Sequence, residues 1–324
     1  MGKYEIDVVA LGELLMDFTV NGVSEQGNLL FEANPGGAPC NVLSMLSKLR
    51  YKTSFIGKVG DDLFGRRLKG VLEELKIGTE NLMMDAAYKT TLAFVHTAAD
   101  GDRDFSFYRK PGADMMLKES ELDSELITST RIFHIGSLSM TDEPVYSATR
   151  TAIEKAKEKG VLISFDPNLR IPLWDNLALA KQRIEYGLSV CDILKISEEE
   201  LEFITGYSTI EEGVAALKRE YKIALITVTL GKYGSKAYYK DFSVTGAPFL
   251  RENVVDTTGA GDTFCACILH FVLAHGIEKL TAVLLANMLM YANAAASLIT
   301  SKKGSLYVMP EEREILELMQ TAEG

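Results

Sequence analysis

The sequence predicts an α/β fold built around a mostly parallel sheet, and three observations support this prediction. Short apolar runs rich in β-branched residues alternate with longer amphipathic segments along the chain. Such alternation is typical of βαβ units, in which helices cover both faces of a sheet. The composition, with 47% hydrophobic and 24% charged residues among 324, is that of an ordinary globular protein long enough to bury a large core.

Six apolar runs are expected to form strands of this sheet. They span residues 6–12, 53–57, 131–136, 161–166, 192–196 and 222–229. Between them, residues 144–160 predict a helix with Asp142 as its cap, Pro144 near its first turn and Gly160 at its end. Because ligands of such folds bind at the carboxyl ends of the strands, we expect the functional site there.

Two segments interrupt the alternation, at residues 13–33 and 91–109, and predict antiparallel hairpins. We expect the second to turn at Asp100-Gly101. One face of its return strand would carry Arg103, Phe105, Phe107 and Arg109. This face is either a sheet edge with surface salt bridges or part of a small lid that covers a polar ligand and excludes water.

Charge and cysteine content exclude several classes of partner and compartment. A net charge of −11 without a basic block argues against nucleic acid and anionic membranes as partners. Four cysteines without C-x-x-C spacing predict a reducing, cytoplasmic setting, and the first twelve residues indicate a strand rather than a signal peptide. Residues 280–301 carry no charge, but their polar and alanine content favours a fully buried helix over a membrane span.

The segment VVDTTGAGDTFCACILHFVLAHG, residues 254–276, carries the chemistry. It predicts a strand end, a glycine-rich turn and a long apolar helix that opens near Gly261 and Asp262. Gly259 and Gly261, with Ala260 between them, allow backbone N–H groups to approach an anion at the helix N-terminus. Asp262 would repel a phosphate that is merely bound, so it is either a general base or a helix cap, and the spacing leaves both open.

Other phosphate-binding classes match less well. The chain contains no G-x-x-x-x-G-K-[ST], and G-A-G-D-T-F lacks the third glycine of a dinucleotide fingerprint. A hydroxyl acceptor that faces a nucleotide γ-phosphate needs donors for the transferred group, a base for the hydroxyl proton and a bridging metal. The segment therefore points to a small-molecule kinase.

At these residues the sequence resembles the ribokinase family of carbohydrate kinases, also called the PfkB family. DTTGAGDTF (256–264) resembles the C-terminal signature of that family, and PGGAPCNV (35–42) with FIGKVGDDLFG (55–65) resembles the N-terminal one. Residues 101–117, 165–174 and 194–206 most resemble fructokinases. The resemblance implies a ribokinase-like three-layer sandwich, one kinase domain over residues 1–324, with antiparallel lid segments inserted at about 13–34 and 90–110.

The same resemblance implies residue roles at the sugar and at the reacting groups. Asp262 corresponds to the catalytic base, and Gly259, Ala260 and Gly261 to the anion hole. Sugar-binding positions correspond to Asp17, Gly36, Gly37, Asn41, Arg109 and Arg170. From the residues alone, Asp17 could be a polar strand end, Asn41 a helix-cap side chain, and the two arginines members of surface ion pairs.

Nucleotide and metal positions are also implied, with one departure from the family pattern. Nucleotide contacts correspond to Lys195, Thr229, Gly231, Gly234 and Asn293, although an ordinary turn and a packing asparagine are the alternatives. Lys195 replaces the asparagine of an N-x-x-E motif; with Ser197 and Glu200 explained as a capping box, Glu198 is the candidate for organising Mg²⁺. Asp256 and Thr258 match a monovalent-cation (K⁺) site, with the alternative that Asp256 only fixes the turn. Asp61 and Asp62 are expected to cap a helix.

We therefore predict an ATP- and Mg²⁺-dependent kinase of a sugar hydroxyl, with fructose as the expected substrate and a homodimer formed through the lid. Two alternatives remain: a kinase for 2-keto-3-deoxygluconate or another sugar, whose carboxylate the arginines could bind, and a catalytically silent sugar-binding protein of the same fold. A dinucleotide-dependent oxidoreductase is a remote third.

Overall fold

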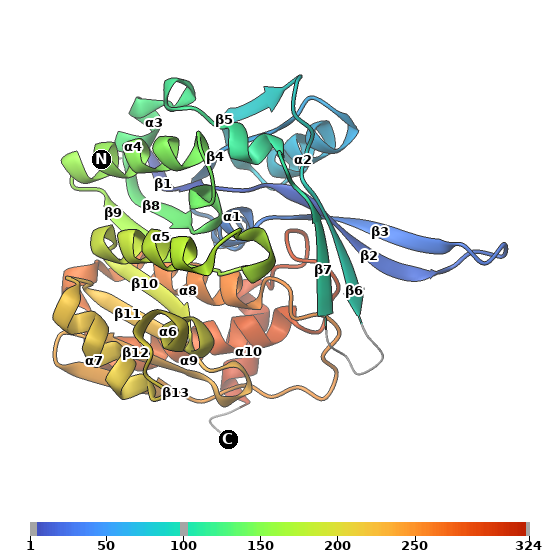
Figure 1. Cartoon of the computed structure of the whole chain (residues 1–324). Helices are drawn as coiled ribbons and strands as arrows, with labels where there is room; N and C mark the ends of the chain where they lie inside the picture. The colour runs from blue at the N-terminus through green and yellow to red at the C-terminus, as the bar shows by residue number, and fades with distance from the viewer. Residues whose placement is uncertain (1–4, 98–102, 322–324) are drawn as a thin grey trace.

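A nine-stranded sheet forms the centre of the computed structural model, which describes residues 5–97 and 103–321 (Figure 1). The strand order is β13-β12-β11-β10-β9-β8-β1-β4-β5. The strands from β5 to β11 are parallel to their neighbours, and only β12 and β13 run antiparallel. The prediction of a mostly parallel sheet is thus confirmed.

Six of the nine strands coincide with the predicted apolar runs. The strands are β1 (Ile6–Leu11), β4 (Thr53–Gly60), β5 (Ile77–Asp85), β8 (Thr130–Gly136), β9 (Leu162–Asp166), β10 (Ile193–Ser197), β11 (Leu225–Thr229), β12 (Ser235–Tyr239) and β13 (Phe242–Gly246). The sequence analysis missed β5, β12 and β13. β5 and β13 are the two edges of the sheet, where polar residues interrupt the apolar pattern because part of each strand faces solvent.

Helices cover both faces of this sheet and complete a three-layer sandwich. One hydrophobic cluster includes buried residues of α1 (Ala38–Lys48), α2 (Leu63–Glu74), α8 (Ala260–His275), α9 (Ala282–Ile299) and α10 (Glu312–Gln320). The cluster on the opposite face includes residues of α3 (Ser124–Thr128), α4 (Val145–Glu158), α5 (Leu177–Val190), α6 (Glu198–Thr205) and α7 (Ile210–Glu220). Each sheet face therefore buries its own apolar layer.

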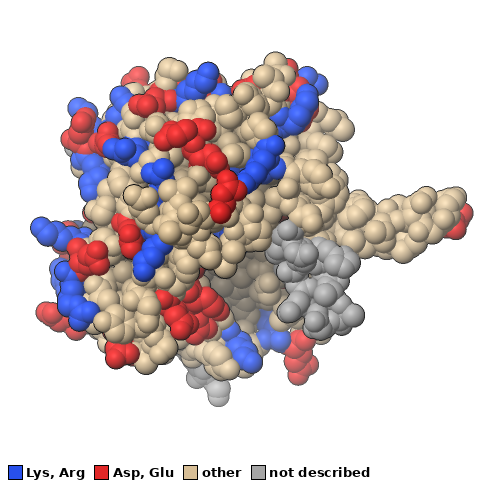
Figure 2. Space-filling model, viewed as in Figure 1, with Lys and Arg blue, Asp and Glu red and all other residues tan. Residues whose placement is uncertain are grey.

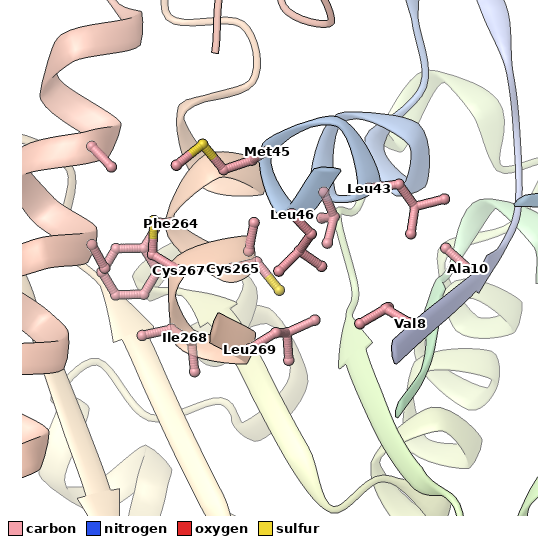
Figure 3. Packing of buried hydrophobic residues seen from close by; sticks show 14 of the residues in the cluster. Val8, Ala10, Leu43, Met45, Leu46, Phe264, Cys265, Cys267, Ile268 and Leu269 are labelled. Atoms are coloured by element: carbon pink, nitrogen blue, oxygen red, sulfur yellow. The ribbon is translucent and has the colours of Figure 1, made fainter. Parts of the chain in front are cut away.

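The contact between α1 and α8 is important for the site. Figure 3 shows Met45 and Leu46 of α1 directed toward Phe264 and Cys265 of α8, with β1 beside them. All four side chains are almost completely buried. Because protein interiors are close-packed, this contact fixes the two helices relative to each other.

A second, smaller sheet stands beside the sandwich. It has the order β3-β2-β6-β7 and consists of β2 (Leu15–Val23), β3 (Leu29–Gly36), β6 (Leu92–Thr97) and β7 (Arg103–Tyr108). Its two hairpins are antiparallel, as predicted, and they join through parallel pairing of β2 with β6. The β2–β3 hairpin projects far from the main body, in the cartoon (Figure 1) and in the space-filling view (Figure 2). The expected turn at Asp100-Gly101 lies outside the described residues.

Two predictions about individual helices are wrong. Asp142 does not cap α4: the helix follows Pro144 without a side-chain cap, and Asp142 instead accepts the Tyr146 N–H through its backbone carbonyl at 2.9 Å. In the other case, α9 is only half buried, because its first turns lie at the surface, so it is not the fully buried helix expected. It is the one helix among the described residues that is long and apolar enough to cross a membrane, and it packs on α8 and β13.

Candidate active site

A cavity of about 590 Å³ lies between the carboxyl ends of the central strands and the smaller sheet. The sandwich contributes the end of β10, the loop after β9, the start of α1 and the turn before α8. The smaller sheet contributes side chains of β2, β3, β6 and β7, among them Thr19, Asn34, Val95 and Phe107. The smaller sheet therefore covers the cavity, as expected of a lid, and we call it the lid sheet.

The N-terminus of α8 opens into this cavity without a side-chain cap. Gly259 is the N-cap residue, with φ +80°, and Gly259 and Gly261 both line the cavity. A Cβ on Gly259 would approach the Ser305 Cβ to 3.0 Å, so glycine is required there by backbone conformation and by space. The N–H groups of Gly261 and Asp262 belong to the first turn of α8, where the amides of a helix lack an intrahelical acceptor. These amides and the helix dipole suit an anion.

Asp262 lies in the first turn of α8 and does not cap it, because the N-cap position belongs to Gly259. The carboxylate is 9% exposed, lines the cavity and accepts a hydrogen bond from Asn41 Nδ2 at 2.7 Å. Burial raises the pKa of Asp262, while the Asn41 hydrogen bond and the positive charges of Lys195 and Arg170 oppose that rise. Of the two readings left open by the sequence, the geometry favours the general base.

The sugar-binding positions predicted near the start of α1 lie close together. Asp17 of β2, Gly37 and Asn41 line the cavity, whereas Gly36 lies just behind Asp17. A Cβ on Gly36 would meet Asp17 Oδ2 at 2.3 Å, so a side chain there would displace the carboxylate. Burial raises the pKa of Asp17 to about 7, with Arg170 opposing the rise.

The two predicted arginines differ sharply in their surroundings. Arg170 is exposed, lines the cavity and precedes the short 3₁₀ helix Ile171–Leu173. Arg109 follows β7, is 4% exposed and does not line the cavity. Its guanidinium donates to Asp114 at 2.7 Å, to Thr141 Oγ1 at 3.1 Å and to the Leu138 carbonyl at 2.8 Å.

This buried network satisfies the Arg109 guanidinium within the protein and supports a structural ion pair, so its predicted role in binding the sugar or phosphate stays a prediction. The expectation that the Phe107 and Arg109 side chains share one face of the strand is also not met. Phe107 lines the cavity, whereas Arg109 turns into the core because Asp114 provides a buried counter-charge. The side chains of Arg103 and Phe105 lie outside the described part of the chain.

Of the predicted nucleotide-binding residues, one lies in the cavity and the others lie along β11, β12 and α9. Lys195 lines the cavity, is paired with Asp166 at 3.0 Å, and lies 3.1 Å from the position of a Cβ on Gly261. Thr229 ends β11, and Gly231 and Gly234 take positive φ in the turn before β12.

The side-chain amide of Asn293, on α9, is hydrogen-bonded within the protein through both of its polar atoms. Its oxygen accepts from Ser235 Oγ at 3.0 Å, and its nitrogen donates to the Ala247 carbonyl at 2.9 Å. Both halves of the amide are therefore occupied within the protein. This arrangement supports the packing alternative for Asn293, and its nucleotide contact stays a prediction.

The predicted metal residues do not form a protein cage. Among the described residues, no group of three or more His, Cys, Asp or Glu side chains is arranged to hold a metal ion. Asp256 and Thr258 line the cavity, but the Asp256 carboxylate accepts the N–H groups of Thr258 at 2.8 Å and Gly304 at 3.2 Å, which fixes the turn before α8. Glu198 is not among the cavity-lining residues.

The expected helix caps are present. Ser197 and Glu200 form the predicted capping box of α6. Asp62 caps α2 by accepting from the Gly65 N–H at 2.9 Å, whereas Asp61 pairs with Arg66 at 2.7 Å. Asp62 therefore acts as predicted, and Asp61 does not cap.

Sequence reasoning missed Glu13, a buried carboxylate in the wall of the cavity. Glu13 is 4% exposed and accepts the Ala38 N–H, at the first turn of α1, at 2.9 Å. Burial raises its pKa to about 7. Nothing in its local sequence marks it, because it follows β1 within an apolar run and its partner lies 25 residues further on.

The contribution of Glu13 to stability is expected to fall as the pH rises from about 4.5 to about 7, and Glu13→Gln should remove this contribution, while Asp17, whose pKa is raised in the same way, keeps its own. In that window the folded state holds the Glu13 proton that the unfolded chain, with an ordinary pKa of 4.5, has already released. The variant keeps an acceptor for Ala38 and should gain up to roughly 3 kcal/mol over wild type between pH 4.5 and pH 8. Urea unfolding across this range measures the difference. Glu25→Gln, at an exposed site, is the control, and a constant gap between wild type and Glu13→Gln would contradict the assignment.

Comparisons with known proteins find relatives over nearly the whole chain. The family model of the pfkB family carbohydrate kinases matches residues 5–312. Fructokinase-1 of Oryza sativa subsp. japonica is 41% identical over 323 residues, which is 99% of each chain. A fructokinase from Xylella fastidiosa with bound ATP has a TM-score of 0.89 at 29% identity and covers 98% of this chain and 99% of its own.

A fructokinase from Vibrio cholerae O395, solved with fructose, ADP and a calcium ion, has a TM-score of 0.86 at 30% identity, over 97% of this chain and 99% of its own. One of these solved relatives thus holds ATP, and the other holds fructose, ADP and a divalent ion. The similarity extends over the whole sandwich and the lid sheet, beyond the glycine-rich turn. On the strength of the family match and of these full-length similarities, the chain belongs to the pfkB family of carbohydrate kinases.

Proposed function

We propose that this protein is an ATP-dependent fructokinase that phosphorylates the primary hydroxyl of fructose, with Asp262 as general base. One observation carries the chemistry: a buried carboxylate lies one residue beyond the uncapped amides of a helix N-terminus, inside a cavity under a lid. The choice of sugar rests on the relatives, which are fructokinases at about 40% identity over the full chain.

In this proposal, Asp262 accepts the proton of the primary hydroxyl while the hydroxyl oxygen bonds to the γ-phosphorus of ATP. The bond between the γ-phosphorus and the bridging β-phosphate oxygen breaks, and ADP leaves. The amides at Gly259 and Gly261 face the charge on the transferred group, whereas the Ala260 N–H, the third predicted donor, already donates to the Thr257 carbonyl at 3.2 Å. Lys195, beside Gly261, adds a positive charge on the same side. Phe107 and Val95 of the lid sheet exclude water, so that ATP hydrolysis does not compete.

We propose Mg²⁺ as the divalent cofactor and K⁺ as a structural ion beside Asp256 and Thr258. Mg²⁺ usually keeps several waters and binds through substrate phosphates with one or two carboxylates, which fits a site without a cage of acidic side chains. Bound there, it would offset charge on the β and γ phosphates. Glu198 is the candidate to orient its water shell. Four buried, free cysteines agree with the proposed cytoplasmic location.

A coupled assay of ADP formation tests the proposed substrate. Fructose, ribose, adenosine and 2-keto-3-deoxygluconate are compared at equal concentration, with Mg²⁺ present or removed by chelation and with K⁺ replaced by Na⁺. We expect the highest kcat/KM with fructose and no turnover without the divalent ion. A preference for ketodeoxygluconate would indicate instead that Arg170 binds the carboxylate of that substrate. Binding of ATP without turnover of any sugar would identify a silent protein.

We also propose a homodimer formed through the outer face of the lid sheet. Phe18, Phe31 and Tyr108 surround Phe94 at ring distances of 4.9 to 5.5 Å, and Phe31 and Tyr108 are 42% and 68% exposed. An aromatic face of this kind on a projecting hairpin is typical of an interface, and a second lid sheet supplies a matching surface.

Light scattering should therefore give a dimeric mass for the wild type. Phe31→Glu should give a monomer, because it places a charge in the proposed interface. Phe242→Glu is the control, because Phe242 is equally exposed, at 44%, but lies on β13. A monomeric wild type at assay concentration would contradict the dimer.

A further inference from the structure

Asn41 links the first turn of α1 to the reacting carboxylate. Its backbone N–H donates to the Gly37 carbonyl at 2.9 Å, which holds the residue in the opening turn of the helix. Its side chain is 3% exposed and donates from Nδ2 to Asp262 Oδ2 at 2.7 Å. An ionised carboxylate only accepts hydrogen bonds, so the amide nitrogen must face Asp262 and the amide oxygen must point elsewhere.

The amide oxygen has no partner in the described protein. Asn41 Oδ1 is buried and receives no hydrogen bond, although Asn41 lines the cavity. Leaving a buried acceptor unpaired costs about 1–3 kcal/mol, so native proteins rarely do so without a reason. A ligand in the cavity that offers a hydroxyl donor would remove this cost. A polyhydroxylated substrate is such a ligand.

We propose that Asn41 is a positioning residue for the catalytic base: its Nδ2–H holds one oxygen of Asp262, and a sugar hydroxyl donating to its Oδ1 completes the arrangement. This inference rests on the proposed function and extends it, because sugar binding alone does not require a contact with the base. With Oδ2 held, the second carboxylate oxygen is left to receive the proton of the reacting hydroxyl. Hydrogen bonds in a chain polarise one another, so occupation of Oδ1 strengthens the bond to Asp262.

A neutral donor is well suited to this place because charged groups already surround Asp262. Lys195 of β10 and Arg170 favour its ionised form, whereas Glu200 of α6 and Asp166 of β9 are nearby carboxylates that disfavour it. The Asn41 hydrogen bond is the largest effect that opposes the burial-driven rise in the Asp262 pKa. An amide thus helps to keep the base ionised without binding it in an ion pair.

The support behind Asn41 is rigid. Glu13 accepts the Ala38 N–H at 2.9 Å and so holds the start of α1. Gly37 has φ +131°, and a Cβ on it would lie 2.4 Å from the Glu13 carbonyl oxygen. Further along the same helix, Met45 and Leu46 pack toward α8 (Figure 3). The donor and the base therefore belong to two helices that pack directly against each other.

Asn41→Ala and Asn41→Asp test this inference through the pH profile of kcat, which reports the base in the substrate complex. For Asn41→Ala we expect kcat about 10- to 100-fold lower on the plateau, and an acid limb about one pH unit higher because a hydrogen bond to the charged form is lost. Asn41→Asp keeps the size of the side chain and should shift the limb further, since two adjacent carboxylates share one proton.

Asn34→Ala is the matched control, because Asn34 lines the same cavity but bonds Thr19 Oγ1 at 3.0 Å and not Asp262. It should leave the acid limb unmoved, whatever its effect on KM. A higher KM in both Asn41 variants with unchanged kcat and acid limb would overturn the inference and leave Asn41 as a sugar contact only.

Carboxyl NMR titration of Asp262 in the sugar-free protein separates this inference from the proposed function. The Asp262 pKa should rise in Asn41→Ala even if the wild type proves inactive on every sugar, because the hydrogen bond exists without substrate. An Asp262 titration identical in wild type and variant would refute the contact itself. Thermal unfolding establishes that each variant is folded, and Asn41→Asp keeps the test available if the alanine variant does not fold.

Discussion

Asp262→Asn is expected to lower kcat by at least ~10²- to 10⁴-fold while fructose and ATP still bind, because the amide cannot accept the hydroxyl proton. The change preserves the size of a side chain that is 9% exposed. A coupled assay measures turnover. Trp174, the single tryptophan, follows the cavity-lining Arg170 and Ile171 closely in sequence, so its fluorescence can follow sugar binding independently.

Glu199→Gln provides the control, since Glu199 is an exposed carboxylate that lines the same cavity. Its turnover should stay within a few-fold of wild type, which would show that the loss in Asp262→Asn is specific to the position. Near-normal kcat in purified Asp262→Asn would eliminate the assignment of the base. Loss of sugar binding together with turnover would instead indicate that Asp262 mainly shapes the cavity.

The fold was predictable because its central strands are buried on both faces. The second half of β1 and most of β11 appear as continuous apolar runs, a pattern expected of strands that are covered on both faces. β5 and β13 were missed for the opposite reason: as edges of the sheet they face solvent and carry polar residues. The local apolar pattern therefore identifies buried segments well. It identifies a strand only where both faces of that strand are buried.

The glycine-rich turn was also predictable, since a helix N-terminus that receives an anion needs glycine where φ is positive and a side chain would collide. Gly259 meets both conditions. Glu13 and Arg109 were not predictable, because each is defined by partners brought together by the fold: Ala38 for Glu13 and Asp114 for Arg109. A single sequence does not show which residues the fold brings together. It therefore cannot tell whether such a residue has a structural or a functional role.

Arg109→Met is expected to destabilise the protein by about 3–5 kcal/mol, because it leaves the buried Asp114 carboxylate without its counter-charge. Arg170→Met should leave stability nearly unchanged, since Arg170 is exposed, but should raise the KM for fructose at least ~10-fold if it binds the substrate. Urea unfolding and steady-state kinetics of both variants measure the two effects. The pair therefore separates an arginine that holds the fold from one that faces the ligand.

The double variant Arg109→Met/Asp114→Leu tests the cause of the loss. Replacing both partners removes the uncompensated charge and should recover part of the stability lost in Arg109→Met. Thr91 Oγ1, which donates to Asp114 in the wild type, then becomes the remaining unpaired group, so recovery should be incomplete. A stable Arg109→Met with a strongly raised KM would reverse the assignment and return Arg109 to the substrate. Because Arg109 and Thr91 lie where β7 and β6 meet the main body, the same series also shows how firmly the lid sheet is anchored.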